Sequence, residues 1–194
     1  MNLLYPVFLK LEGKSCVVVG GGEVATRKVM TLLDAKALVT VISPRLTQTL
    51  KLMFQQKDII YKPYKYKHGD IKNAFLVIGA TDDRQVNEQI FKDAQQRQIL
   101  VNIVDVPECC NFYVPSICNR GDLKIAISTN GLAPALARFI RESLEKLIPS
   151  KIAADIQKLA RLRADQRKAV PDDSRLRGKL ARKEARIIAE KYFA

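Results

Sequence analysis

The stretch Lys14-Ser-Cys-Val-Val-Val-Gly-Gly-Gly-Glu-Val-Ala25 decides the predicted fold, because a short apolar run leads into three glycines and then into a helical pattern. Gly20, Gly22 and Ala25 match the G-x-G-x-x-A form of the dinucleotide-binding fingerprint. Gly20 allows a tight turn, a Cβ at Gly22 would hold the backbone away from a pyrophosphate, and a small Ala25 lets helix and strand pack closely. The free N–H groups at the start of the helix would bind the phosphates.

Glycine-rich turns are common, so the same residues also fit a strand-to-helix turn that binds no ligand. The position of the motif favours the nucleotide-binding interpretation. It lies near the N-terminus, and the helix that it opens reaches about residue 35. A second β-branched run at residues 38–42 follows, as a βαβ unit requires.

The alternation of strand and helix continues to about residue 102 and predicts an α/β fold with a Rossmann-like parallel sheet. Further strands are expected at 58–61, 74–79 and 99–102, and helices at 46–55 and 84–96. Ligands of such sheets bind beyond the carboxyl ends of the strands, where several loops converge. These loops hold the candidate cofactor-binding residues Gly20, Gly22, Glu23, Val24, Ser43, Pro44, Arg45, Thr81, Asp82 and Asp83.

One element of the fingerprint is missing. An acidic residue about 20 positions after the glycines usually binds the adenosine ribose, but here the second strand ends in Ser43-Pro44-Arg45. A serine can still bond a ribose hydroxyl, and Arg45 would tolerate a 2′-phosphate. The sequence therefore leaves NAD and NADP both open.

Beyond residue 106 the pattern changes. Residues 112–115 and 123–128 are expected to pair as strands, and helices are expected at 134–147, 151–169 and 174–192. The predicted organisation is a cofactor-binding domain at 1–110, a strand-and-helix segment at 111–149 and a basic helical domain at 150–194.

The composition is that of a globular protein, since 47% of the 194 residues are hydrophobic. No apolar run approaches the roughly 18 residues of a membrane span, and the N-terminus lacks the features of a signal peptide, so we expect a cytoplasmic protein. The formal charge is +13, and residues 146–194 carry 14 Lys/Arg against 6 Asp/Glu. Such charge fits an anionic partner or a solvated basic face.

Several classes of site are not expected. The four cysteines form no C-x-x-C pair and there is one histidine, His68, so no metal site is predicted and His68 is expected to be a solvated loop residue. The basic tail lacks the aromatic residues of a nucleic-acid stacking surface. We therefore expect neither a nucleic-acid nor a membrane partner.

Several stretches together resemble one family, in family order over roughly the first 145 residues. The chain resembles the precorrin-2 dehydrogenases of siroheme synthesis, some of which are also sirohydrochlorin ferrochelatases. The matching stretches are Tyr5-Pro-Val-Phe-Leu9, Val19-Gly-Gly-Gly-Glu-Val-Ala-Thr-Arg-Lys28, Ala80-Thr-Asp-Asp-Arg84, Asn102-Ile-Val-Asp105, Phe112-Tyr-Val-Pro-Ser116 and Pro134-Ala-Leu-Ala-Arg138.

The resemblance implies oxidation of precorrin-2 to sirohydrochlorin with NAD as hydride acceptor, by a homodimer joined through residues 111–149. It also implies that Asp105 is the functional acid. From the residues alone, a carboxylate after a strand end can accept a proton, and it can equally serve as a loop cap before Pro107. Where many family members have hydroxyl residues before Pro134, this chain has Leu132 and Ala133, with Ser128 and Thr129 nearby.

Two alternatives stay open. The protein can be bifunctional and also insert Fe²⁺ into sirohydrochlorin, because chelation needs a base and a held macrocycle rather than a metal-ligand cluster. It can also be a non-enzymatic module that senses a dinucleotide. Precorrin-2 carries eight carboxylates, which would give the basic residues a partner, although the sequence does not identify the Lys or Arg residues that bind them.

Overall fold

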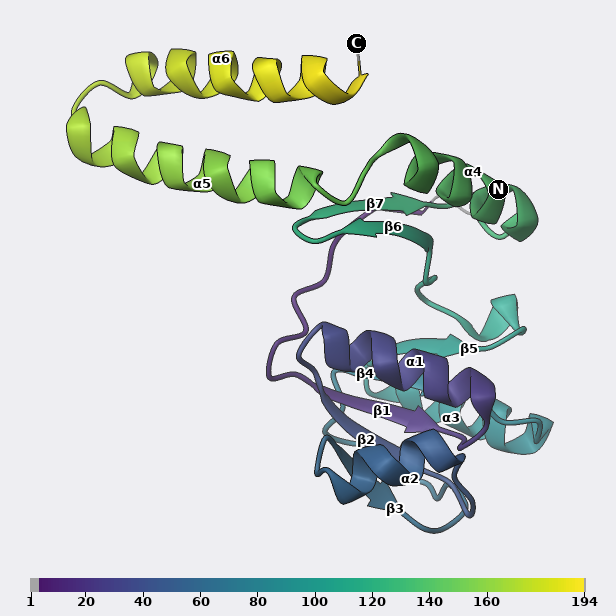
Figure 1. Cartoon of the computed structure of the whole chain (residues 1–194). Coiled ribbons are helices and arrows are strands. Elements are labelled where there is room, and N and C mark those ends of the chain that lie inside the picture. The colour runs from purple at the N-terminus through teal and green to yellow at the C-terminus, as the bar shows by residue number, and fades with distance from the viewer. Residues whose placement is uncertain (1–3, 194) are drawn as a thin grey trace. The chain divides into compact units, whose positions relative to one another are not determined.

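The computed structural model describes residues 4–193, which divide into two compact units at residues 4–113 and 114–193 (Figure 1). The division of the chain into functional segments at 1–110, 111–149 and 150–194 stays a prediction, and its outermost residues, 1–3 and 194, lie outside the described part. None of the helices within residues 4–193 is both long enough and apolar enough to cross a membrane.

The first unit confirms the predicted α/β fold. Its five strands are all parallel and lie in the order β3-β2-β1-β4-β5. The elements are β1 (Ser15–Val19), α1 (Glu23–Asp34), β2 (Leu38–Ile42), α2 (Gln48–Gln55), β3 (Ile59–Lys62), β4 (Leu76–Gly79), α3 (Arg84–Gln96), β5 (Leu100–Ile103) and a short 3₁₀ turn, η1 (Pro107–Cys109).

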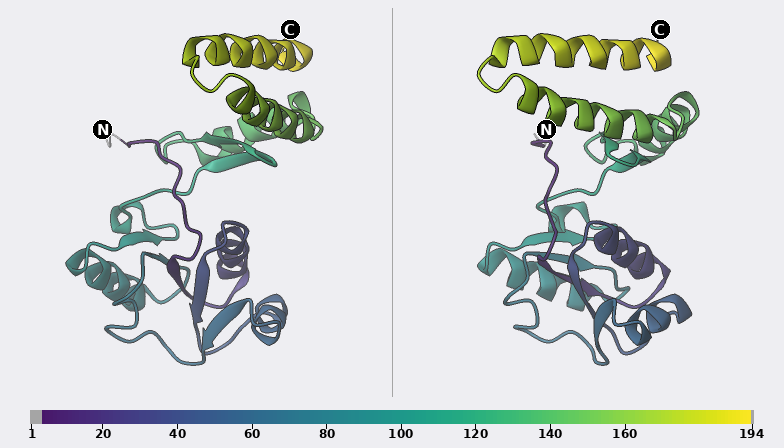
Figure 2. Two further views of the ribbon diagram at one scale, coloured as in Figure 1. Left: turned by 90° about the vertical axis from the view of Figure 1, so that its left-hand side faces the viewer. Right: turned by 60° about the vertical axis from the view of Figure 1, so that its left-hand side comes forward.

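Helices cover both faces of this sheet. Figure 2 shows α1 and α2 on one face and α3 on the other. Side chains alternate along β1, so that Cys16 and Val18 pack toward α1 whereas Val17 and Val19 pack toward Ile90 of α3. Because both faces are buried, β1 and β4 are continuous apolar runs, as expected of central parallel strands.

The connection from β3 to β4 has no helix. Residues 63–75 instead cross the α3 side of the sheet as a loop, in which Ile71 is buried and Tyr64 and Tyr66 pack against the same cluster as α3. This loop becomes part of the candidate site.

The second unit contains an antiparallel hairpin and three helices. These are β6 (Ser116–Arg120), β7 (Leu123–Ile127), α4 (Pro134–Leu147), α5 (Ile152–Ala169) and α6 (Ser174–Phe193). The helices agree with prediction within one residue at each end. The tip of α6 is tied to α5 where Lys191 Nζ bonds Asp155 Oδ2 at 2.7 Å.

One predicted strand is wrong. Pairing with β7 begins at Ser116 rather than at Phe112. The reason is local: the Phe112 carbonyl accepts a hydrogen bond from Asn102 at 3.0 Å, and Pro115 has no N–H to contribute to a ladder. Residues 112–115 therefore belong to the connection that precedes the hairpin.

Candidate functional site

The carboxyl ends of the central strands lie side by side. Val19 at the end of β1 pairs with Ile42 of β2 and with Gly79 of β4, and Gly79 pairs with Ile103 of β5. The chain leaves β1 toward β2 and later returns to the other side of β1, which makes this edge a topological switch point. The loops after these four strands therefore meet at one edge of the sheet.

The glycine-rich turn has three different requirements. Gly20 has φ +123°, and a Cβ there would lie 2.1 Å from the Ala80 carbonyl oxygen. At Gly21 a Cβ would lie 1.9 Å from the Arg45 carbonyl oxygen, so the fold itself needs both glycines. At Gly22 a Cβ would meet no protein atom within 4 Å. Since the fold does not fill the space at Gly22, that position fits a residue kept small for a ligand.

The start of α1 is open to an anion. Gly22 is its N-cap residue and makes no side-chain hydrogen bond to the helix, so the first N–H groups have no side-chain cap. Ala25 is fully buried against the sheet, as the fingerprint predicts. The turn is held to the next loop, because Thr47 N donates to Gly21 O at 2.9 Å and the hydroxyls of Thr26 and Thr47 bond at 2.9 Å.

Two of the predicted polar residues shape their own loops. The Ser43 hydroxyl is buried, donates to the Arg45 carbonyl at 2.7 Å and accepts from Arg45 N at 3.4 Å. Asp83 caps α3 by accepting from Gln85 N at 3.1 Å and Val86 N at 3.2 Å. Asp82 is exposed beside it.

A pocket of about 300 Å³ lies at this edge. Six of the predicted cofactor-binding residues line it: Gly20, Ser43, Pro44, Thr81, Asp82 and Asp83. Four others do not line it: Gly22 precedes α1, Glu23 and Val24 are the first residues of α1, and Arg45 lies in the loop after β2. Lys65 and Tyr66 also line the pocket, and sequence reasoning missed them because they follow β3, the edge strand of the sheet.

Asp105 lies just beyond β5, at the same edge. Its φ is +60°, a left-handed conformation that costs most non-glycine residues on the order of 1 kcal/mol and that aspartate adopts more readily than most. The surrounding loop is held firmly, because Asn102 donates to Phe112 O, and Asn111 accepts from Val101 N at 2.8 Å. The pocket lining does not include Asp105.

Lys28 is a charged residue near Asp105, and sequence reasoning missed it. It lies on α1 and is half-buried. Burial lowers the pKa of the Lys28 amine, as does the neighbouring Arg27, whereas attraction to Asp105 opposes these effects. The available signal was its spacing, since Lys28 lies three and four residues beyond Ala25 and Val24 on the same helix face.

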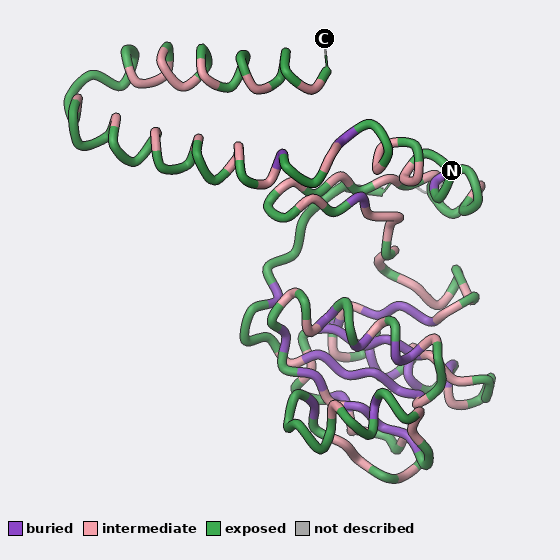
Figure 3. The backbone as a smooth tube through the Cα atoms, viewed as in Figure 1, coloured by how far each residue is buried: buried purple, intermediate pink, exposed green. Residues whose placement is uncertain are grey.

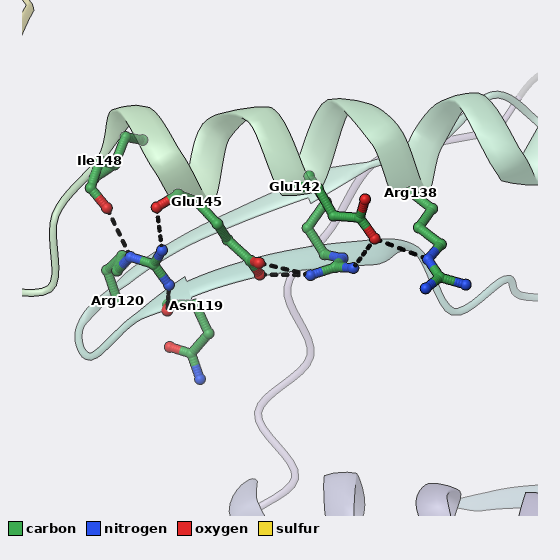
Figure 4. Close-up of polar contacts among 7 residues, drawn as sticks. Asn119, Arg120, Arg138, Glu142, Glu145 and Ile148 are labelled. Carbon is green, nitrogen blue, oxygen red and sulfur yellow. Dashed lines mark hydrogen bonds and ion pairs between the residues drawn. The ribbon is translucent and has the colours of Figure 1, made fainter.

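The arginines of α4 are engaged within the second unit (Figure 4). Arg138 bonds Glu142 at 2.9 Å, and Arg141 bonds Glu145 at 2.7 Å. Arg120 of β6 donates to the carbonyls of Glu145 and Ile148, which end the helix. Thr129 accepts from Ala133 N at 3.1 Å and Ser128 from Asn130 N at 3.1 Å, so both hydroxyls order the turn before α4.

Among residues 4–193, no three His, Cys, Asp or Glu side chains are grouped so as to hold a metal ion.

Comparison with known proteins decides the family. A family model described as "Putative NAD(P)-binding" matches residues 7–116, which is more than half of the chain, and one described as "Sirohaem biosynthesis protein central" matches residues 120–147. The chain belongs to the NAD(P)-binding family of siroheme synthases. This confirms the resemblance drawn from the sequence motifs.

Similar proteins cover both units. Siroheme synthase of Methylobacillus flagellatus is 46% identical over 165 residues, which are 85% of this chain and 34% of that protein. Siroheme synthase of Photorhabdus laumondii is 45% identical over 147 residues, 76% of this chain and 31% of that protein. The chain thus spans about a third of the length of these curated relatives. The solved structure of SirC, precorrin-2 dehydrogenase, covers 97% of this chain and 100% of its own, with 28% identity and a TM-score of 0.72.

Proposed function

We propose that the protein oxidises precorrin-2 to sirohydrochlorin with NAD⁺ as the oxidant, in siroheme synthesis. The observation that carries the proposal is the strand edge at which the open glycine turn, the pocket and Asp105 meet. The match to a precorrin-2 dehydrogenase over nearly the whole of both chains supports it.

The residues at the edge fit the parts of a dinucleotide. The N–H groups at the start of α1, in the loop of Gly20, Gly22, Glu23 and Val24, would hold the pyrophosphate. The loops of Ser43–Arg45 and Thr81–Asp83 would hold the adenosine portion. When bound, NAD⁺ supplies the acceptor for a hydride.

Removal of a hydride from a reduced tetrapyrrole is balanced by loss of a proton, and Asp105 is the group proposed to accept it. Its carboxylate is exposed at the edge, where a substrate carbon can approach. The Lys28 ammonium is attracted to this carboxylate and adds a positive charge near it. Geometry at the reacting atom then decides the rate.

The substrate and the assembly are proposed from charge and exposure. The many carboxylates of precorrin-2 suit a chain of formal charge +13. Association into a homodimer is supported by apolar side chains on and before α4 that stay exposed, Leu132, Leu136 and Phe139. A cytoplasmic location stays a prediction.

The decisive experiment is an anaerobic assay of the full chain with precorrin-2 and NAD⁺. We expect sirohydrochlorin and NADH in equal amounts. Asp105→Asn should lower kcat by about 10²-fold or more without changing NAD⁺ affinity, because the change removes a base and keeps the shape. Glu108→Gln, an exposed carboxylate on the same loop, is the control and should keep full activity. A dimeric, folded protein that forms no NADH would refute the proposal.

Adding Fe²⁺ or Co²⁺ to the product of the same assay tests the bifunctional alternative. A rate of metal insertion equal to that without protein would reject a ferrochelatase activity. If insertion is catalysed, Asp105→Asn shows whether one carboxylate serves both reactions.

A further inference from the structure

One wall of the strand-edge pocket does not come from the loops of the nucleotide fingerprint. Lys65 and Tyr66 lie on the helix-free loop that connects β3 to β4, yet both line the pocket with Ser43, Pro44 and Thr81. We propose that Tyr66 and Lys65 form the wall against which the adenosine portion of the cofactor binds, and that the buried Asp93 positions Tyr66. The identity of this ligand rests on the proposed function.

Asp93 holds the loop through an unusually complete set of donors. It lies on α3, and none of its surface is exposed to solvent. Its Oδ2 accepts from the Tyr66 hydroxyl at 2.6 Å, and its Oδ1 accepts from Gln89 Nε2 at 2.7 Å. His68 Nδ1 lies 2.7 Å from the same Oδ1. His68 is thus more than the solvated residue predicted from sequence, although its side chain is 62% exposed.

The charge states of Asp93 and Tyr66 favour a lasting hydrogen bond that holds the Tyr66 side chain in place. Burial alone would raise the pKa of Asp93, but hydrogen bonds from Tyr66, Gln89 and His68 outweigh it and hold this pKa below its usual value. Burial and the bond to Asp93 raise the pKa of Tyr66, so its hydroxyl stays protonated and continues to donate. A buried carboxylate is costly unless fully bonded, and here its bonds connect α3 to a loop that carries two pocket residues.

The chemistry of the wall suits a flat base next to a ribose. Tyr66 offers an aromatic surface, and Pro44, Ile42 and Val86 supply apolar surface from β2, its following loop and α3. Lys65 adds one positive charge to the lining, and the exposed Asp82 and Asp83 add two negative charges. Purine rings bind to such aromatic and apolar surfaces because every base has a polarisable face.

The missing acid after β2 leaves a part of adenosine recognition for other residues to supply. In the usual fingerprint that acid binds the adenosine ribose, whereas here the position holds Ser43-Pro44-Arg45 and the Ser43 hydroxyl already donates within its own turn. The Ser43–Arg45 and Thr81–Asp83 loops then bind the adenosine without that acid, and residues from another loop can add to its recognition. Among the lining residues, Tyr66 and Lys65 are those that the loop from β3 to β4 supplies.

The same loop offers a matched control. Tyr64 lies two residues before Tyr66, is also half-buried, and its hydroxyl also donates to a carboxylate, Asp70, at 3.1 Å. Tyr64 does not line the pocket. Substitutions at Tyr64 therefore change the loop in a comparable way without removing the proposed binding surface.

The test is calorimetric titration of the full chain with NAD⁺ and with ADP-ribose, which lacks the nicotinamide. Tyr66→Ala should raise both dissociation constants by about 10-fold or more, whereas Tyr64→Ala should change them less than twofold. Tyr66→Phe keeps the ring but loses the bond to Asp93, and Asp93→Asn weakens the same bond. Each of these two variants should raise the dissociation constants for NAD⁺ and ADP-ribose by about three- to tenfold. In the anaerobic assay these variants should raise the KM for NAD⁺ while kcat at saturation stays within twofold of wild type.

The outcomes separate this inference from the proposed function. If wild type binds NAD⁺ and ADP-ribose but Tyr66→Ala binds both normally, the wall is refuted and the function stands. The wall is also refuted if Tyr66→Ala weakens NAD⁺ but not ADP-ribose, or if Tyr64→Ala is equally damaging. If wild type binds neither ligand, the proposed function fails first. Melting temperatures of all variants show whether each is folded. If Asp93→Asn is not folded, Tyr66→Phe still tests the bond between Tyr66 and Asp93.

Discussion

The two units of the chain bury their apolar side chains to very different extents. In the first, helices cover both faces of the sheet, and two clusters of buried side chains surround β1 and β4. In residues 114–193 the fully buried apolar side chains are Cys118, Ala137, Ile148 and Ile152, whereas Leu132 is 88% and Phe139 66% exposed. Figure 3 shows this contrast along the backbone. The first unit has a large core of its own, whereas the second has few buried apolar side chains and presents apolar surface that suits a partner.

The largest expected effect breaks the core of the first unit. Ile90→Ala removes a fully buried side chain between α3 and the sheet and should lower the free energy of unfolding of this unit by about 2–5 kcal/mol. Ile187→Ala, on α6 of the second unit, removes a side chain that is 53% exposed and should change the free energy of unfolding of the second unit by less than about 0.5 kcal/mol. Hydrogen exchange in increasing urea reports on each unit separately. Equal losses from the two variants would contradict the comparison.

A smaller effect is expected where the second unit depends on polar contacts. Arg120→Ala removes the bonds to the carbonyls of Glu145 and Ile148 and should weaken the C-terminal end of α4 by about 2 kcal/mol, since bonds from a charged group exceed neutral ones. Arg138→Ala is the control and should cost only about 0.3–0.5 kcal/mol, because its pair with Glu142 is exposed. Hydrogen-exchange rates of the α4 amides measure the stability loss in both variants. A larger loss from Arg138→Ala than from Arg120→Ala would contradict the stabilising role given to Arg120.

Gly22→Ala separates folding from binding within the first unit. No protein atom opposes a Cβ there, so stability should fall by about 1 kcal/mol or less, while NAD⁺ affinity should fall at least about 10-fold, or about 1.4 kcal/mol. Gly20→Ala must instead clash with the Ala80 carbonyl and destabilise the fold itself. Thermal melting and NAD⁺ titration distinguish the two. If Gly22→Ala binds NAD⁺ with normal affinity, the pyrophosphate does not bind at this turn.

The smallest expected effect depends on pH. The pKa of Asp93 is lowered in the folded protein, so its contribution is fully present above the unfolded value of about 3.9 and is lost as the pH falls through the folded pKa. Wild type should exceed Asp93→Asn in stability by about 1 kcal/mol at pH 7 and by less at pH 3. Unfolding free energies at pH 7, 4.5 and 3 test this; a difference independent of pH would show that the carboxylate is not the cause.

Much of the fold could be predicted from local patterns. α3 and α4 agree with their predicted limits, because Asp83 and Pro134 are strong start signals and each helix has a clear apolar face. The strand predicted at 112–115 is wrong because Phe112 and Tyr113 have high strand propensity, and propensity cannot show that Asn102 already binds the Phe112 carbonyl. That bond joins residues 10 positions apart, which only the folded loop brings together.

The candidate site divides in the same way. By itself the sequence determined the sheet, the loops at its carboxyl edge and the family, because glycine conformations and strand periodicity are local properties that the spacing of residues records. Only the tertiary structure decided that Tyr66 and Lys65 line the pocket, that Asp93 holds Tyr66, and that Lys28 lies near Asp105. These residues come from elements far apart in the chain, and the positions of Tyr66 and Lys65 depend on how a helix-free loop packs across the sheet.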